Sequence, residues 1–511
     1  MVNTDIEVHA LGDGAHVALR GAAGTLSYAE LSREIARTAA RLQALGFGGR
    51  RPVAVLCENR AEIMLFYYAI ARLGGTFVPV NASLSAPEVA YILAHAEASV
   101  LVYDERMQEI AKAALAEGGS TPGMTLAEFM AVEAPVVEMA AAVSAQDTFL
   151  MVYTSGSTGK PKGVALSQAN EVAGNASLIE MWGMGPQDVN VVALPMGYHY
   201  GLTTATAATL QSGGQAVLLR RFHPREVLEA LVQHRATVFQ GVPTMFAMML
   251  EYAEQNGVEV DLSFMRLLIS AGAPLSTELR ERFEKRFVKR IDDYYALTES
   301  RPIFGRYWND PAPVPRQAIG KAAPGALVKI VDAQGHDVAD GVEGEFYVRG
   351  PSVTPGYLKN EAQTRELFNE DGLIRTGDLG YRDSEGFYYI TGRTKDLIIR
   401  GGANIAPAEV EQVLGQHGSV QSVAVLGVPD EKFGQLVAAY VVPRSGQLPQ
   451  QEELQAWCQG RLAEFKIPAY IVPAKELPLG NTGKVDKKAL LAHWMEGLKR
   501  QWRSDRPVGL S

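Results

Sequence analysis

The chain has 511 residues, a formal net charge of −9 and a hydrophobic fraction of 47%. These values are ordinary for a soluble globular protein, and the length allows a large core and more than one domain. The acidic balance excludes an overall bias toward nucleic acid or anionic membranes. Cys57 and Cys458 are the only cysteines, which excludes a disulfide scaffold or a cysteine-based zinc site and is typical of a reducing compartment.

The start of the chain, Met1 to Glu7, is acidic and lacks the basic and apolar pattern of a secretory signal. No apolar run approaches the length of a membrane span. We therefore expect a cytoplasmic protein without a membrane span or a nucleic-acid partner. Whether it is a monomer or a homodimer stays open at this point.

The N-terminal third alternates predicted helices and strands. Ser27 and Glu30 form a capping-box pair at the start of the first clear helix. The next expected elements are strands at 53–57, 76–80 and 99–103 and helices at 61–73 and 87–95. Strand–helix–strand repetition predicts a parallel sheet in an α/β fold. Residues 116–145 are weakly patterned and are interpreted as a loose connection.

The texture of the sequence changes twice later in the chain. Alternation continues through expected strands at 216–219, 236–240 and 267–270, and from about Ala326 the chain becomes strand-rich. Near Lys395 a compact α+β pattern begins. The predicted fold is therefore α/β, with a large N-terminal domain at 1–394 containing parallel-sheet layers and a β-subdomain, and a small α+β domain at 395–511.

A Gly-rich basic segment, Thr154 to Gly163, follows an apolar strand. Its glycines allow close backbone approach, and its hydroxyls, amides and two lysines suit phosphate oxygens. It is not a Walker loop, because Thr154 replaces the first glycine and Pro161 replaces the magnesium-binding hydroxyl. The alternative is a flexible surface linker. The two lysines directly after a strand favour polyphosphate binding.

Three further segments carry polar side chains suited to a nucleotide. Tyr295 can stack on a base, Thr298 can bond a phosphate, and Glu299 can hold a hard cation such as Mg²⁺. Asp378 can hold ribose hydroxyls with help from Arg393. Considered singly, each has a plainer interpretation as a loop, a turn or a surface salt bridge.

Lys484 lies in a Gly-rich turn near the end of the chain, between Asn481 and Asp486. A lysine held in this way can reach into a cleft as a mobile point charge. A solvated lysine is the common alternative, and its neighbours Lys487 and Lys488 are typical of that case.

Taken in order, these segments resemble the adenylate-forming (ANL) superfamily, which includes the AMP-binding acyl-CoA synthetases. The resemblance runs from about Leu26 to Leu490. It rests on five motifs, which are Tyr153 to Gly163, Tyr295 to Glu299, Arg375 to Asp378, Gly392 to Asp396 and Asn481 to Lys484. It implies a ligase that joins a carboxylic acid to ATP as acyl-AMP, releases pyrophosphate, and then transfers the acyl group to coenzyme A.

The resemblance also implies a role for each residue. The phosphate-binding set is Thr154, Ser155, Gly156, Ser157, Thr158, Gly159, Lys160 and Lys162. Adenine would be framed by Gly272, Ala273, Pro274 and Tyr295, and ribose would be held by Asp378 and Arg393. The expected catalytic set is Lys484, Thr298, Glu299 and His199, with Glu299 as the Mg²⁺ ligand. Lys395 would be the hinge of a mobile C-terminal domain, and Gly401 and Gly402 would line the coenzyme A channel.

The acyl pocket is expected near Tyr198 and His199, with Gly241, Thr244 and Met245 on another wall. Amino-acid-activating relatives usually carry an aspartate near His199, and its absence here argues against an α-amino acid. Ala296 replaces the glycine common in the family and is expected to narrow the site.

Arg301 follows Glu299 by two residues and raises a separate question about the acid. An arginine in the pocket would pair a second carboxylate and favour a dicarboxylic acid. The alternative is an arginine paired with Glu299 or another acidic neighbour of the protein.

Three functions remain in competition on the sequence. The first is an acid–CoA ligase using ATP, Mg²⁺ and coenzyme A. The second is a stand-alone adenylation enzyme that loads the phosphopantetheine of an acyl carrier protein. The third is a non-catalytic ATP-binding protein, which the intact Lys160, Glu299, Asp378 and Lys484 oppose.

Overall fold

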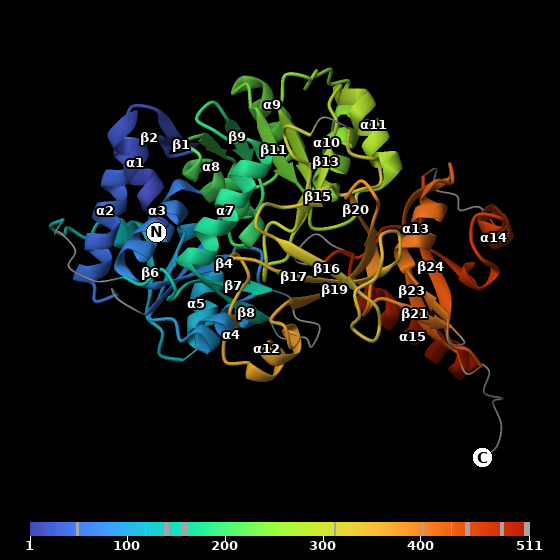
Figure 1. Cartoon of the computed structure of the whole chain (residues 1–511). Coiled ribbons are helices and arrows are strands. Elements are labelled where there is room, and N and C mark those ends of the chain that lie inside the picture. The colour runs from blue at the N-terminus through green and yellow to red at the C-terminus, as the bar shows by residue number, and fades with distance from the viewer. Residues whose placement is uncertain are drawn as a thin grey trace, which may run out of the picture.

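The computed structural model describes residues 1–47, 51–117, 119–136, 143–154, 161–310, 313–400, 403–430, 432–444, 450–480 and 485–504, without the side chains of 404 and 498–504. A large body carries the blue-to-gold part of the chain, and a smaller orange-to-red unit lies beside it (Figure 1). Among the helices in those ranges, none combines the length and apolarity needed to cross a membrane.

One sheet of the large body has the order β15-β14-β13-β12-β11-β9-β10-β1-β2. Its strands are β1 (Val17–Gly21), β2 (Gly24–Ser27), β9 (Val189–Val192), β10 (Gln215–Leu218), β11 (Val238–Gly241), β12 (Leu267–Ser270), β13 (Asp292–Tyr295), β14 (Phe304–Gly305) and β15 (Lys321–Ala322). The run from β1 to β13 is parallel and only the edges are antiparallel. Its central strands are short, buried apolar runs, as expected for a parallel sheet covered on both faces.

The second sheet has the order β18-β8-β7-β4-β3-β5-β6. Its strands are β3 (Pro52–Cys57), β4 (Thr76–Asn81), β5 (Val100–Tyr103), β6 (Gly123–Thr125), β7 (Thr148–Thr154), β8 (Lys162–Ser167) and β18 (Gly356–Tyr357). The strands from β6 to β7 are parallel, and β7 turns back into β8 as an antiparallel pair. These parallel sheets confirm the predicted α/β class.

Helices pack between and around the two sheets (Figure 1). They are α1 (Thr4–Gly12), α2 (Tyr28–Ala44), α3 (Ala61–Leu73), α4 (Ala86–Ala96), α5 (Gln108–Glu117), α6 (Leu126–Met130), α7 (Gln168–Trp182), the π-helix η2 (Tyr200–Ala207), α8 (Ala208–Gln211), α9 (Pro224–Gln233), α10 (Pro243–Asn256) and α11 (Thr277–Phe287). Ten of the thirteen residues of α3 are buried, and its side chains share one core cluster with strands of both sheets. Such all-round burial is typical of a helix enclosed between two layers.

The β-subdomain is an antiparallel sheet in the order β16-β17-β19-β20, accompanied by α12. Its elements are β16 (Leu327–Val331), β17 (Gly344–Arg349), α12 (Glu361–Leu367), β19 (Ile374–Arg382) and β20 (Tyr388–Arg393). The last residue of β20, Arg393, is paired directly opposite Asp378.

The C-terminal unit has its own sheet and two core clusters. Its elements are β21 (Ile398–Arg400), β22 (Ala403–Ile405), α13 (Pro407–Gly415), β23 (Val420–Asp430), β24 (Gly434–Pro443), α14 (Gln451–Cys458), β25 (Tyr470–Pro473) and α15 (Lys487–Ser504). Its sheet starts three residues after Lys395. The assignment of the domain boundary and hinge to Lys395 stays a prediction.

The interpretation of 116–145 as a loose connection is wrong in part. β6 and α6 lie within it, and β6 extends the parallel sheet beside β5. Thr125 caps α6 by a capping box with Glu128. A three-residue strand and a five-residue helix are too short to leave a periodic hydrophobic pattern.

Candidate active site

The two described ends of the predicted phosphate segment, Thr154 and Lys162, belong to the paired strands β7 and β8. Thr154 and Lys162 are paired across the two strands, so both ends of the loop meet at one rung of the sheet. Lys162 is the first residue of β8, and β8 also pairs with the edge strand β18.

Lys162 belongs to a small polar cluster with Tyr357 and Glu299. The Lys162 ammonium lies 4.9 Å from the centroid of the Tyr357 ring. The Tyr357 hydroxyl donates to Glu299 Oε1 at 2.7 Å. Burial lowers the pKa of Lys162, the nearby charge of Lys395 lowers it further, and Glu299 opposes the shift. The phosphate strand, the Glu299 motif and the predicted hinge therefore meet here.

Asp378, a predicted ribose ligand, is the centre of a second cluster. It is 4% exposed, accepts a hydrogen bond from the Tyr295 hydroxyl, and accepts another from Arg393 Nε at 2.5 Å. The Arg393 side chain is 52% exposed, so most of its donors stay accessible. The Tyr295 ring stacks on Phe304 with 5.3 Å between centroids. A half-open arginine, a carboxylate and an aromatic ring suit a nucleoside.

The backbone before Asp378 is held by residues that the sequence analysis missed. Gly377 adopts φ +72°, a conformation that favours glycine, and its N–H donates to Glu345 Oε1 at 3.0 Å. The Gly377 carbonyl accepts from Thr394 N at 2.8 Å. Glu345 therefore supports Asp378 and the segment leading to Lys395. Glu345 and Tyr357 lie in ordinary strand sequence, which carries no motif that marks them.

The predicted adenine-binding residues follow the carboxyl ends of neighbouring parallel strands. Gly272, with φ +84°, and then Ala273 and Pro274 come directly after β12, and Ala271 N donates to the Gly241 carbonyl at the end of β11. Ligands of open α/β sheets bind at such strand ends. Thr298 lies in a tight turn after β13, which Leu297 N closes by donating to the Ser300 carbonyl at 2.9 Å. The binding roles of these residues stay predictions.

The predicted acyl-pocket residues come from two adjacent segments. Tyr198 and His199 precede η2. The first residue of that helix is Tyr200, whose hydroxyl lies 3.5 Å from the Gly241 carbonyl oxygen. Thr244 and Met245 lie in the first turn of α10, where Met245 is 5% exposed. These five predicted residues therefore lie on neighbouring elements.

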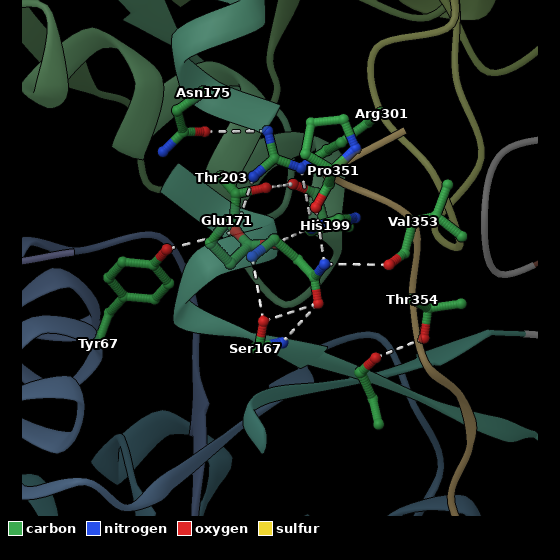
Figure 2. A network of polar contacts seen from close by, with 12 residues as sticks. Tyr67, Ser167, Glu171, Asn175, His199, Thr203, Arg301, Pro351, Val353 and Thr354 are labelled. Carbon is green, nitrogen blue, oxygen red and sulfur yellow. Dashed lines mark hydrogen bonds and ion pairs between the residues drawn. The ribbon is translucent and has the colours of Figure 1, made fainter. Parts of the chain in front are cut away.

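Arg301 is not available to a second substrate carboxylate. It is 3% exposed, and Figure 2 shows its guanidinium facing protein acceptors. Arg301 Nη2 donates to Glu171 Oε2 at 2.7 Å, Nη1 donates to Asn175 Oδ1 at 2.9 Å, and Nε donates to His199 Nε2 at 3.0 Å. The dicarboxylate hypothesis based on Arg301 is therefore wrong in its premise, and pairing with an acidic neighbour holds instead.

Glu171, on α7, joins His199 to Arg301 (Figure 2). Its Oε1 lies 2.9 Å from His199 Nε2, and its Oε2 accepts from Arg301 and from the Tyr67 hydroxyl at 3.3 Å. Although burial alone raises the pKa of Glu171, Arg301 and His199 lower it below its usual range. Burial lowers the pKa of His199, against the pull of Glu171. The cluster thus holds a carboxylate, a guanidinium and a neutral imidazole.

A magnesium ion fits the polar cluster around Glu299. The described ranges contain no group of three or more His, Cys, Asp or Glu side chains placed to hold a metal. Mg²⁺ at a phosphate site is commonly held by one or two carboxylates, with phosphate oxygens and water completing the shell. Among the described residues, Tyr357 donates to Glu299 through Oε1, which leaves Oε2 for such an ion.

Several predicted site residues lie outside the described residues, and nothing further is said of their structure. They are Ser155, Gly156, Ser157, Thr158, Gly159 and Lys160 of the phosphate loop, Gly401 and Gly402 of the predicted coenzyme A channel, and Lys484.

Comparison with known proteins identifies the family. Residues 6–358 match the AMP-binding enzyme model and residues 409–484 match the AMP-binding enzyme C-terminal domain. The chain is 34% identical to indoleacetate–CoA ligase of Aromatoleum aromaticum, over 94% of this chain and 96% of the relative. It is 32% identical to sulfoacetate–CoA ligase of Cupriavidus necator, over 92% of each.

Among solved structures, ATP-bound MatB from Rhodopseudomonas palustris has a TM-score of 0.88 at 31% identity, covering 96% of this chain and 99% of that one. The apo form of MatB from the same organism has a TM-score of 0.77 at the same coverage. The arrangement of this chain is thus more similar to the ATP-bound form. With both family domains matched and relatives above 30% identity over nearly the whole chain, this chain belongs to the AMP-binding enzymes of the adenylate-forming superfamily.

Proposed function

We propose that this protein is an AMP-forming acid–CoA ligase that uses ATP and Mg²⁺. The observation that carries the proposal is that the two ends of one motif segment each join a polar cluster, Tyr295 with Asp378 and Arg393, and Glu299 with Tyr357 and Lys162. Two relatives that match over nearly their full length are named as CoA ligases, which supports the same reaction.

In the first half-reaction, a carboxylate oxygen attacks the α-phosphorus of ATP, and the bond to the β-phosphate oxygen breaks to release pyrophosphate. Asp378 and Arg393 hold the ribose, Tyr295 stacks near the base, and Thr298 bonds the α-phosphate. Lys162 and the loop from Thr154 neutralise the leaving pyrophosphate. Glu299 would hold Mg²⁺, and the ion would supply further neutralisation of the phosphate charge. The carboxylate is already a nucleophile, so positioning and electrostatics suffice.

In the second half-reaction, the thiol sulfur of coenzyme A attacks the acyl carbonyl carbon. The bond from this carbon to the AMP oxygen breaks, AMP leaves, and the thiol proton passes to solvent. We propose that the C-terminal domain turns about Lys395 between the two steps. This movement withdraws Lys484 from the adenylation site and brings the segment containing Gly401 and Gly402 to the thiol.

The acceptor is tested separately from the adenylation. The exchange of labelled pyrophosphate into ATP, driven by a carboxylic acid, reports the first half-reaction alone. Thioester formation with free coenzyme A or with a phosphopantetheinylated carrier protein then distinguishes the ligase from the carrier-loading alternative. If no carboxylic acid drives the exchange of pyrophosphate into ATP, the proposal is contradicted and a non-catalytic ATP-binding protein is favoured.

Lys162 provides a test of the assignment of the steps. Lys162→Ala should slow adenylation more than thioester formation from preformed acyl-AMP, because pyrophosphate is present only in the first step. Single-turnover rates of the two half-reactions measure this difference. Equal losses in both would contradict the placement of Lys162 at the leaving group.

A further inference from the structure

The buried cluster of Glu171, His199 and Arg301 is built from three separate parts of the fold. Glu171 is on α7, His199 precedes η2, and Arg301 follows the Thr298–Glu299 turn. Their side chains are 1%, 7% and 3% exposed. A carboxylate and a guanidinium hidden to this degree are rare in proteins unless they are paired.

The charges within the cluster cancel. Glu171 is ionised, Arg301 is always protonated, and His199 is neutral, so the sum is zero. Each guanidinium nitrogen of Arg301 has an acceptor, which is Glu171, Asn175 or His199. With its side chain only 3% exposed, this arginine is enclosed by the protein.

The cluster lies directly behind the predicted acyl pocket. His199 is itself a predicted pocket residue, and the next residue, Tyr200, contacts the Gly241 carbonyl and has its ring centroid 6.1 Å from that of Tyr294. Gly174 on α7 lets the helix approach Arg301 closely, because a Cβ there would lie 2.9 Å from the Arg301 carbonyl oxygen. The packing therefore fixes the cluster against the pocket wall.

A fixed charge in such a wall would select the substrate by its charge. Coulomb interactions act over several ångströms where water is excluded. An unpaired Arg301 would favour an acid with an anionic far end, and an unpaired Glu171 would favour a cationic one. The curated relatives do not decide this point, because indoleacetate carries an uncharged ring whereas sulfoacetate carries a second anionic group.

We propose that Glu171 is a specificity-determining residue, which cancels the charge of Arg301 behind His199 and so sets the pocket for acids whose far end is uncharged. The proposal rests on the proposed ligase function and names its substrate class as monocarboxylic acids with an apolar or neutral tail.

The test compares acids matched in length that differ only in the charge of the far end. Butanoate, butanedioate and 4-aminobutanoate form one set, and 3-phenylpropanoate with its 4-carboxyphenyl analogue forms another. The measurement is the ratio of kcat/KM values in acid-driven pyrophosphate exchange, for the wild type, Glu171→Gln, Arg301→Gln and the double variant.

The wild type should prefer the uncharged acid of each set. Glu171→Gln should shift the ratio toward the diacids by about tenfold or more, and Arg301→Gln should shift it toward 4-aminobutanoate. The double variant, with a neutral cluster again, should return to the ratio of the wild type. A cluster that served only folding would lower all activities together and would not move the ratios in opposite directions.

Ratios that stay within about twofold of the wild type in both single variants would overturn the proposal, since charge is then not sensed. If one single variant fails to fold, the kcat/KM ratios of the other single variant and of the double variant still show the direction of the shift. If both fail, a wild-type preference for a diacid over its matched monoacid overturns the proposal, and the reverse preference supports it. If none of the acids drives exchange, the proposed ligase function is contradicted, and this inference falls with it.

Discussion

Two arginine–carboxylate pairs flank the same motif segment, and they serve different ends. Arg393 pairs with Asp378 on the proposed nucleotide side, and its side chain is 52% exposed. Arg301 pairs with Glu171 on the proposed acyl side, and its side chain is 3% exposed. An arginine that is half open keeps donors for a ligand, whereas one whose nitrogens are all engaged builds the wall behind a ligand. Exposure, rather than distance from the motif, distinguishes them.

The pairs also differ in how the chain assembles them. Asp378 and Arg393 face each other across one β-hairpin, so strand register alone brings them together. Glu171 and Arg301 are 130 residues apart and meet only because α7 packs against the segment after β13.

The largest effect is expected on the nucleotide side. Asp378→Asn removes the charged acceptor of Arg393 and Tyr295 and the proposed ribose ligand. Because hydrogen bonds to charged groups contribute about 1.5–3 kcal/mol each, kcat/KM for ATP should fall about 100-fold or more. Pyrophosphate exchange measures the loss.

The matched control is Asp340→Asn, in the same subdomain. Asp340 pairs with Arg382 on the surface, where both side chains are 44% exposed. Activity should stay unchanged, since exposed pairs contribute little. A loss of less than about threefold in Asp378→Asn would remove Asp378 from the nucleotide site.

Gly174→Ala acts on the acyl side, through the fit of α7 against Arg301. The added Cβ would lie 2.9 Å from the Arg301 carbonyl oxygen, so the backbone must move. Overpacking of this kind costs about 1–3 kcal/mol, partly offset by the better helix propensity of alanine. The free energy of unfolding in urea should fall.

Gly497→Ala is the control for Gly174→Ala, because Gly497 lies within α15 and an added Cβ there meets nothing within 4 Å. Alanine should stabilise this helix by about 0.5–1 kcal/mol. Equal effects of the two substitutions would mean that the close approach at Gly174 does not constrain α7.

The neutral state of His199 makes the stability of the folded protein depend on pH. Its pKa in the folded protein is lowered by burial from an ordinary value of 6.5. Below about pH 6.5 the unfolded chain therefore binds a proton that the folded protein refuses, so stability falls as the pH falls. The slope from this group approaches 1.4 kcal/mol per pH unit.

Urea unfolding of His199→Gln at pH 5.5, 6.5 and 7.5 should show a shallower loss of stability than the wild type. Part of the slope should remain, because burial also lowers the pKa of His95 and His234. His336→Gln is the control, since that side chain is 80% exposed. An unchanged slope in His199→Gln would mean that His199 does not resist protonation.

The smallest effect is expected at an ion pair that joins the two domains away from both clusters. Arg444 of the C-terminal unit donates to Glu278 at the start of α11, with side chains 36% and 34% exposed. Glu278→Arg should shift the ratio of adenylation to thioester formation by a few-fold at most, because such a pair contributes about 0–1 kcal/mol. The reversed pair, Glu278→Arg with Arg444→Glu, should restore the ratio. No recovery would mean that the pair does not influence the arrangement of the domains.

Local patterns in the sequence were sufficient for the α/β class and for the family motifs on which the proposed nucleotide roles rest. Buried apolar runs mark the parallel strands, and Tyr295, Glu299, Asp378 and Arg393 lie in short motifs whose spacing is set by hairpins and turns. Such spacing can be recognised in the sequence because strand register and turn geometry depend on only a few neighbouring residues.

The acyl side depended on tertiary structure. Nothing near Glu171 in the sequence marks it as the partner of Arg301, and Arg301 alone suggested a second substrate carboxylate. Helix packing brings the two together, and burial then requires that each charge find a partner. The sequence by itself determined the family, its motifs and the α/β class. Tertiary packing alone decided whether an arginine beside the motif faces the ligand or is neutralised by the protein, since that depends on contacts 130 residues apart.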